Sequence, residues 1–96
     1  MATFINLATF TDQGIKNIKE SPDRLNAYRA MAEKMGLTVK SAYYTTGTYD
    51  MVVIVEGPED AGMASLLKLG SLGNVRSQTL RGFSPEEMRA IIARMP

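Results

Sequence analysis

The sequence predicts an α+β fold in which strands and helices follow the order β-α-β-β-α-β, with a further helix at the C-terminal end. Three observations predict it. Candidate strands and helices occur in that order along 96 residues, a length that suits one domain over residues 1–96. The second and third strands are joined only by Gly47–Asp50, which implies an antiparallel hairpin. Met51–Val55 is apolar at every position, so both faces of the third strand need cover.

The first half of the chain supplies two strands and the helix between them. Thr3–Phe10 is rich in β-branched and aromatic residues, which predicts a strand. Thr11 can cap a short helical turn, and the cap residue Ser21, followed by a proline and an acid, then begins a helix predicted over Pro22–Met35. Thr38–Thr46 predicts the second strand. Apolar residues of the helix recur every three or four positions, and its polar side comprises Arg24, Asn26, Arg29, Glu33 and Lys34.

The second half repeats the pattern and adds a helix. Met51–Glu56 predicts the third strand, a helix begins at Pro58 and ends by Gly73, and Val75–Leu80 predicts the fourth strand. A capping box begins the last helix at Ser84. We expect that helix to pack on the domain, since its apolar stripe would otherwise be exposed; the stripe comprises Met88, Ile91, Ile92 and Met95.

The predicted sheet has one face that this chain cannot cover. In a β-α-β-β-α-β fold both helices lie on one face of a four-stranded antiparallel sheet. An identical subunit packed sheet to sheet would cover the other face with twofold symmetry. The expected architecture is therefore a ferredoxin-like domain in a dimeric α+β barrel, and the expected partner is a second copy, in a homodimer or a higher homo-oligomer.

Composition excludes several classes of function. Eleven basic and ten acidic residues give a formal charge of +1 without runs of either sign, so we expect no nucleic-acid partner. No apolar stretch approaches the ~20 residues that span a bilayer, and the N-terminus lacks a signal core, so we expect a cytoplasmic protein without a membrane partner. The chain has no cysteine and no histidine, so we expect no metal site and no cofactor, and catalysis would rest on Asp, Glu, Tyr, Lys or Arg.

The predicted site lies around the hairpin, at Tyr49, Asp50 and Arg76, with Asn6 and Tyr44 as further ligand-binding candidates from neighbouring strands. Asp50 borders the most apolar strand, where a carboxylate needs a partner. It either accepts backbone N–H groups and fixes the turn, or faces a cavity between the sheets as a functional carboxylate. Arg76 could pair with an acid or hold a carboxylate ligand. The tyrosines serve either as packing elements or as phenol donors in the site.

Several segments together resemble the family of small GYD-domain proteins. Gly47-Thr48-Tyr49-Asp50 follows a strand rich in Thr and Tyr, as in that family's signature. Further segments are similar to its other recurring blocks: Thr11-Asp12-Gln13-Gly14-Ile15, Lys19 with Pro22, Gly70-Ser71-Leu72-Gly73-Asn74-Val75-Arg76 and Thr79-Leu80-Arg81. The resemblance covers nearly the whole chain. It implies a ferredoxin-like fold of the dimeric α+β-barrel group, and it implies no particular reaction.

Three roles remain open from the sequence. The first is a sensor or binding protein, in which a dimer binds a small organic molecule in or near the cavity between the sheets. The second is a cofactor-free enzyme of the small monooxygenase or isomerase kind. The third is a structural or assembly module. An apolar pocket with a few polar groups would favour the first two roles, and a fully packed interior would favour the third.

Overall fold

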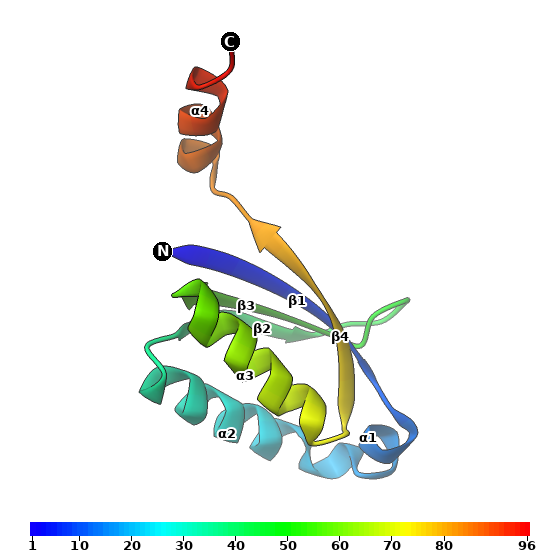
Figure 1. The fold of residues 1–96 in the computed structure, drawn as a ribbon. Coiled ribbons are helices and arrows are strands. Elements are labelled where there is room, and N and C mark those ends of the chain that lie inside the picture. Colours follow the sequence, from blue (N-terminus) through cyan, green and yellow to red (C-terminus); the bar gives the residue numbers. More distant parts are fainter.

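The computed structural model describes residues 1–96 and contains one antiparallel sheet with two long helices on one of its faces (Figure 1). The strands are β1 (Ala2–Phe10), β2 (Thr38–Tyr44), β3 (Met51–Gly57) and β4 (Val75–Gly82). The helices are α1 (Asp12–Lys16), the 3-10 helix η1 (Ile18–Glu20), α2 (Ser21–Lys34), α3 (Glu59–Ser71) and α4 (Pro85–Ala93). The strand order β2-β3-β1-β4 confirms the predicted ferredoxin-like α+β fold. The structure contains no helix that could span a lipid bilayer.

Most element ends lie close to their predicted positions, and the exceptions have local causes. Ser21, predicted as the cap of α2, lies inside that helix because η1 leads directly into it. β4 continues beyond the predicted Leu80 to Gly82, because β1 offers backbone partners as far as the Thr3–Gly82 pair. At the start of α1, the Thr11 side chain accepts a hydrogen bond from the Gly14 N–H at 3.1 Å, as the cap prediction requires.

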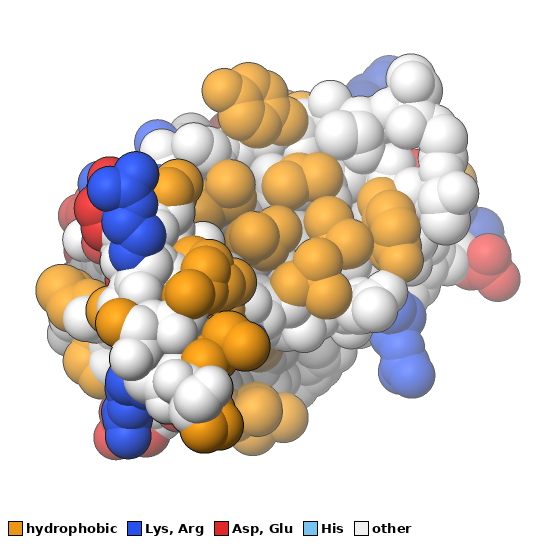
Figure 2. Space-filling view, turned by 90° about the horizontal axis from the view of Figure 1, so that it is seen from above, with side chains coloured by type: hydrophobic (Ala, Val, Ile, Leu, Met, Phe, Trp, Pro, Cys, Tyr) orange, Lys and Arg blue, Asp and Glu red, His pale blue; other side chains and the backbone are white.

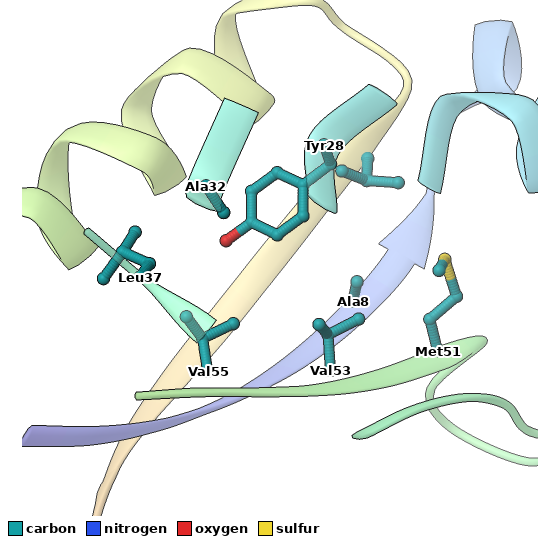
Figure 3. Close-up of a cluster of buried hydrophobic side chains, with 8 residues drawn as sticks. Ala8, Tyr28, Ala32, Leu37, Met51, Val53 and Val55 are labelled. Atoms are coloured by element: carbon teal, nitrogen blue, oxygen red, sulfur yellow. The ribbon is translucent and has the colours of Figure 1, made fainter. Parts of the chain in front are cut away.

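The hydrophobic core lies between the sheet and the two long helices (Figure 3). It consists of Ala8, Tyr28, Ala32, Leu37, Met51, Val53, Val55 and Val75. β3 contributes every second residue to it, which is the alternation expected of a strand. The Tyr28 hydroxyl is buried with the core and meets the Ser65 hydroxyl of α3 at 3.2 Å, so its polar atom has a partner.

The other face of the sheet, which we call the open face, has no cover from this chain. The strand registers bring six apolar side chains together on it, and we call them the open-face patch: Ile5, Leu7, Tyr43, Val52, Ile54 and Leu80. Figure 2 looks onto this side of the molecule and shows hydrophobic side chains across its middle. Leu80 is 41% exposed and Tyr43 is 65% exposed. β3 is apolar on both faces, and the helices of this chain cover only one of them. The other apolar face is therefore in contact with solvent.

Helix α4 projects away from the sheet and does not pack on the domain (Figure 1). Its apolar side continues to Met95, just beyond the helix, and we call these residues the α4 stripe; Met88, Ile91, Ile92 and Met95 are between 42% and 68% exposed. The expectation that this helix packs within the chain is therefore wrong for the single subunit. The Cα radius of gyration of 14.6 Å exceeds the value of about 12.5 Å typical of a compact domain of this length. β4 carries the helix outward, beyond the reach of α2 and α3.

Candidate functional site

The structure brings three of the five predicted site residues to one end of the open face. Ala8 pairs with Met51 and Thr9 pairs with Arg76, so Asp50 and Arg76 lie on either side of Thr9. The Tyr49 hydroxyl donates a hydrogen bond to Gln78 Oε1 at 2.7 Å, which ties the hairpin turn to β4. Tyr49, Asp50 and Arg76 therefore border one end of the apolar patch, and we call them the hairpin cluster.

Asp50 braces the hairpin through its backbone and its carboxylate. Its N–H donates to the Ala8 carbonyl at 2.9 Å, and its carbonyl accepts from the Thr45 N–H at 2.8 Å. The Phe10 N–H donates to Asp50 Oδ2 at 2.9 Å, just past the last pair of the β1–β3 ladder. These contacts match the turn-fixing alternative that the sequence left open. One carboxylate oxygen of Asp50, Oδ2, therefore accepts a hydrogen bond from a backbone N–H.

Arg76 has no carboxylate partner in this chain. The two ion pairs of the structure join Arg24 to Glu20 and Arg81 to Glu59, so of the two alternatives for Arg76, the pairing with an acid of this chain such as Asp50 or Glu56 does not form. Arg76 is exposed at the edge of the open face. An exposed, unpaired guanidinium can hold an anion or a carboxylate from another molecule.

The other two predicted residues, Asn6 and Tyr44, lie on the helix side of the sheet. Asn6 is 3% exposed, and its Oδ1 accepts a hydrogen bond from Thr79 Oγ1 at 3.0 Å. The Tyr44 hydroxyl meets the Ser21 hydroxyl of α2 at 2.9 Å. The sheet separates these two residues from the hairpin cluster. Any ligand at the hairpin cluster would therefore bind without them.

Two of the recurring blocks in the sequence contact each other. The Thr11 N–H donates to the Asn74 carbonyl at 3.1 Å, and the Thr11 hydroxyl donates to the Gly73 carbonyl at 2.6 Å. Gln13 Nε2 donates to Asn74 Oδ1 at 3.0 Å. Gly14 packs so closely here that a Cβ atom would lie 2.0 Å from the Asn74 carbonyl oxygen. These blocks therefore hold α1 against the connection between α3 and β4.

A cavity of about 260 Å³ lies between the sheet and helices α2 and α3. Asn6 lines it, together with two residues that sequence reasoning did not select, Arg24 and Lys68. The helical periodicity places Arg24 on the polar side of α2, but only 24% of its side chain is exposed. The first turn of α2 packs beside η1, and Arg24 Nη1 donates to the Asn17 carbonyl at 2.9 Å. In the sequence, the position of Arg24 in the first turn of α2 was the only feature that could have indicated its place beside the cavity.

Comparisons with protein families and with known proteins identify relatives of the chain. The family model of the GYD domain matches residues 4–92. The chain is 34% identical over 92 residues to a Thermus thermophilus protein named "Glutamine synthetase and cystathionine beta-lyase binding protein", with 94% of this chain and 97% of the relative aligned. A crystal structure of a Thermus thermophilus protein has the same fold, with a TM-score of 0.52, 24% identity and coverage of 88% of this chain and 95% of that chain. The sequence blocks, the fold and the family match agree, and the chain belongs to the GYD-domain family.

Proposed function

We propose that residues 1–96 form a homodimeric module that binds partner enzymes. The observation that carries this proposal is the presence of two separate apolar surfaces on one small chain, the open-face patch and the α4 stripe. Contiguous exposed apolar surface of this kind marks interaction sites. The name of the Thermus thermophilus relative supports the choice of enzymes as partners, with glutamine synthetase and cystathionine beta-lyase as the first candidates.

We assign the open-face patch to the second copy of the chain. Face-to-face packing of two sheets joins inner faces whose side chains interdigitate, and a twofold axis between them brings the same patch onto itself. Ile5 and Ile54 are cross-strand neighbours at the centre of the patch, and polar residues such as Thr9 and Glu56 surround it. An apolar centre with a polar rim is the usual anatomy of such an interface.

We assign the α4 stripe to the partner enzyme. An amphipathic helix that projects from its domain can lay its apolar side in a groove of another protein. Two of the four stripe residues are methionines, whose flexible side chains adapt to different surfaces. That adaptability fits a module that binds more than one enzyme.

Two point variants test the dimer, because adjacent residues of β3 face opposite sides. Val53 is 7% exposed in the core, so Val53→Asp should prevent folding. Ile54 lies in the open-face patch, so Ile54→Asp should leave a folded monomer of 10.5 kDa, whereas the wild type should have twice that mass by light scattering. A wild-type monomer at micromolar concentration would contradict the proposal. An Ile54→Asp protein that remains dimeric would exclude the open face as the contact.

Deletion of residues 84–96 tests the role of α4. We expect the shortened chain to remain dimeric and to lose binding to purified glutamine synthetase and cystathionine beta-lyase, measured by calorimetry. Met88→Lys, which places a charge on the stripe, should weaken the same binding, and Arg89→Ala is the matched control. A shortened chain that becomes monomeric would make α4 part of the subunit contact. Unchanged enzyme binding after the deletion would refute the assignment.

A second candidate function is the binding of a small organic molecule at the hairpin cluster. The unpaired Arg76 and the phenol of Tyr49 favour it, because a second sheet on the open face would enclose this end of the patch. A cofactor-free enzyme would use the same residues. Thermal-shift screening of the dimer against small carboxylic acids, quinones and phenols tests this candidate. Binding that survives both Arg76→Met and Asp50→Asn would exclude the hairpin cluster.

A further inference from the structure

The cavity between the sheet and the helices is partly open to solvent and is distinct from both proposed protein-binding surfaces. Eleven of its 17 lining residues are hydrophobic, and they come from β1, β3, β4, α2, α3 and the connection between α3 and β4. Its volume of about 260 Å³ exceeds the roughly 150 Å³ of an engineered cavity that binds benzene. At about 30 Å³ for each water-sized group, it has room for on the order of nine non-hydrogen atoms.

The charged residues of the lining are all basic. Arg24 and Lys68 contribute to it, one from each long helix, and no aspartate or glutamate does. The nearest carboxylate to the Arg24 guanidinium is Glu20, 3.7 Å from Nη1, and the Glu20 side chain is 73% exposed. The wall of the cavity is therefore positively charged beside an apolar interior.

One nitrogen of Arg24 lacks a hydrogen-bond partner. Nη1 donates to the Asn17 carbonyl at 2.9 Å, whereas Nη2 is buried and meets no acceptor. A buried donor on a charged group carries a large desolvation cost unless an acceptor reaches it. A carboxylate is the acceptor that a guanidinium binds best, through parallel N–H···O contacts.

We infer that this cavity binds a small aliphatic carboxylate. The Arg24 guanidinium turns toward the cavity so that the carboxylate accepts hydrogen bonds from Nη2, and the carboxylate lies near the Lys68 ammonium group. The hydrocarbon chain extends among Leu25, Met31 and Leu69, away from water. Apolar burial supplies most of the affinity, and Arg24 selects the acid over a neutral or cationic compound of the same shape.

Octanoate is a suitable probe, because its ten non-hydrogen atoms are about the number that the cavity can hold. Its matched controls are 1-octanol, which lacks the charge, and octylamine, which reverses it. We expect octanoate to bind the wild-type protein at least tenfold more tightly than either control in calorimetric titrations. Side-chain amide signals of Asn6 and Asn74, which both line the cavity, should shift in NMR spectra on addition of octanoate.

Two variants test the assignment of the residues. Arg24→Met keeps the apolar stem and removes the guanidinium, so the preference for octanoate over 1-octanol should fall at least tenfold. Arg29→Met, on the exposed side of the same helix, should leave that preference unchanged. Ala27 is an exposed residue of the lining, so Ala27→Phe should preserve the fold and reduce octanoate binding at least tenfold by obstructing the cavity.

Four results would overturn the inference. They are equal binding of octanoate and 1-octanol, no detectable octanoate binding, an unchanged preference in Arg24→Met, and amide shifts confined to residues outside the cavity. The experiment does not depend on the enzyme-binding proposal. Octanoate binding without enzyme binding, or the reverse, would refute one proposal and leave the other in place.

Discussion

Replacement of Asp50 by alanine should destabilise the hairpin by about 2 kcal/mol, since hydrogen bonds to charged groups contribute about 1.5–3 kcal/mol. The estimate rests on the part-buried contact in which the Phe10 N–H donates to Asp50 Oδ2 at 2.9 Å. Alanine offers no acceptor to that donor. Asparagine retains an acceptor, so Asp50→Asn should cost only about 1 kcal/mol. A loss of 1 kcal/mol lowers the melting temperature of a domain of this size by about 4–8 °C.

The assay is thermal unfolding followed by circular dichroism, at one fixed protein concentration because dimerisation would make the melting temperature depend on concentration. Glu33→Ala, at an exposed position in α2, is the control and should change the melting temperature little. Equal melting temperatures for wild type and Asp50→Ala would refute the conclusion that the Asp50 carboxylate stabilises the hairpin. Loss of stability in Asp50→Asn as large as in Asp50→Ala would show that the carboxylate charge matters more than the hydrogen bond to Phe10.

Further variants test other contacts of the chain. Gly14→Ala should cost about 2 kcal/mol or more, because the added Cβ would lie 2.0 Å from the Asn74 carbonyl oxygen, and a melting temperature equal to that of the wild type would refute this. Its control is Gly70→Ala in α3, where nothing lies within 4 Å of the added Cβ, and it should stabilise the helix by about 0.5–1 kcal/mol. Ser84→Ala removes the acceptor for the Glu87 N–H at 3.1 Å and should lower the NMR-derived helix content of the first turn of α4. Hydrogen bonds from the Ser84 backbone N–H and then from its side chain lower the pKa of Glu87 from 4.5, so this cap stabilises α4 above that pH and is lost as the pH falls through the lowered pKa. If the first turn of α4 loses the same helix content on acidification in the wild type and in Glu87→Gln, the assignment of this pH dependence to Glu87 would be contradicted.

The position of α4 marks a limit of sequence reasoning. Its start was predictable, because the capping box uses only contacts between neighbouring residues and the structure contains both of them. The apolar α4 stripe predicts that another surface packs against it. The sequence does not show whether that surface belongs to the same chain. β4 leads the helix away from the sheet, so the cover must come from outside this subunit (Figure 1).

The candidate site was predictable only in part. The sequence indicated that Asp50 borders the most apolar strand, and it left open whether the carboxylate fixes the turn or faces a cavity between the sheets. Tyr44 could not be placed, because a register shift between Val39 and Ser41 reverses which residues of β2 face the helices. Without that shift Tyr43 would face α2, and with it Tyr44 does, as its hydrogen bond to Ser21 demonstrates.

The order of the elements, the antiparallel hairpin at Gly47–Asp50 and the need to cover both faces of β3 could all be inferred from the amino-acid sequence. These features follow from caps, turns and side-chain alternation, which act between residues close in the chain. The three-dimensional packing was needed to reveal that Arg24 lines a cavity with Lys68 and that Asn6 and Asp50 lie on opposite sides of the sheet. Those relations depend on how distant segments pack and on strand register, and neither is encoded in a local pattern.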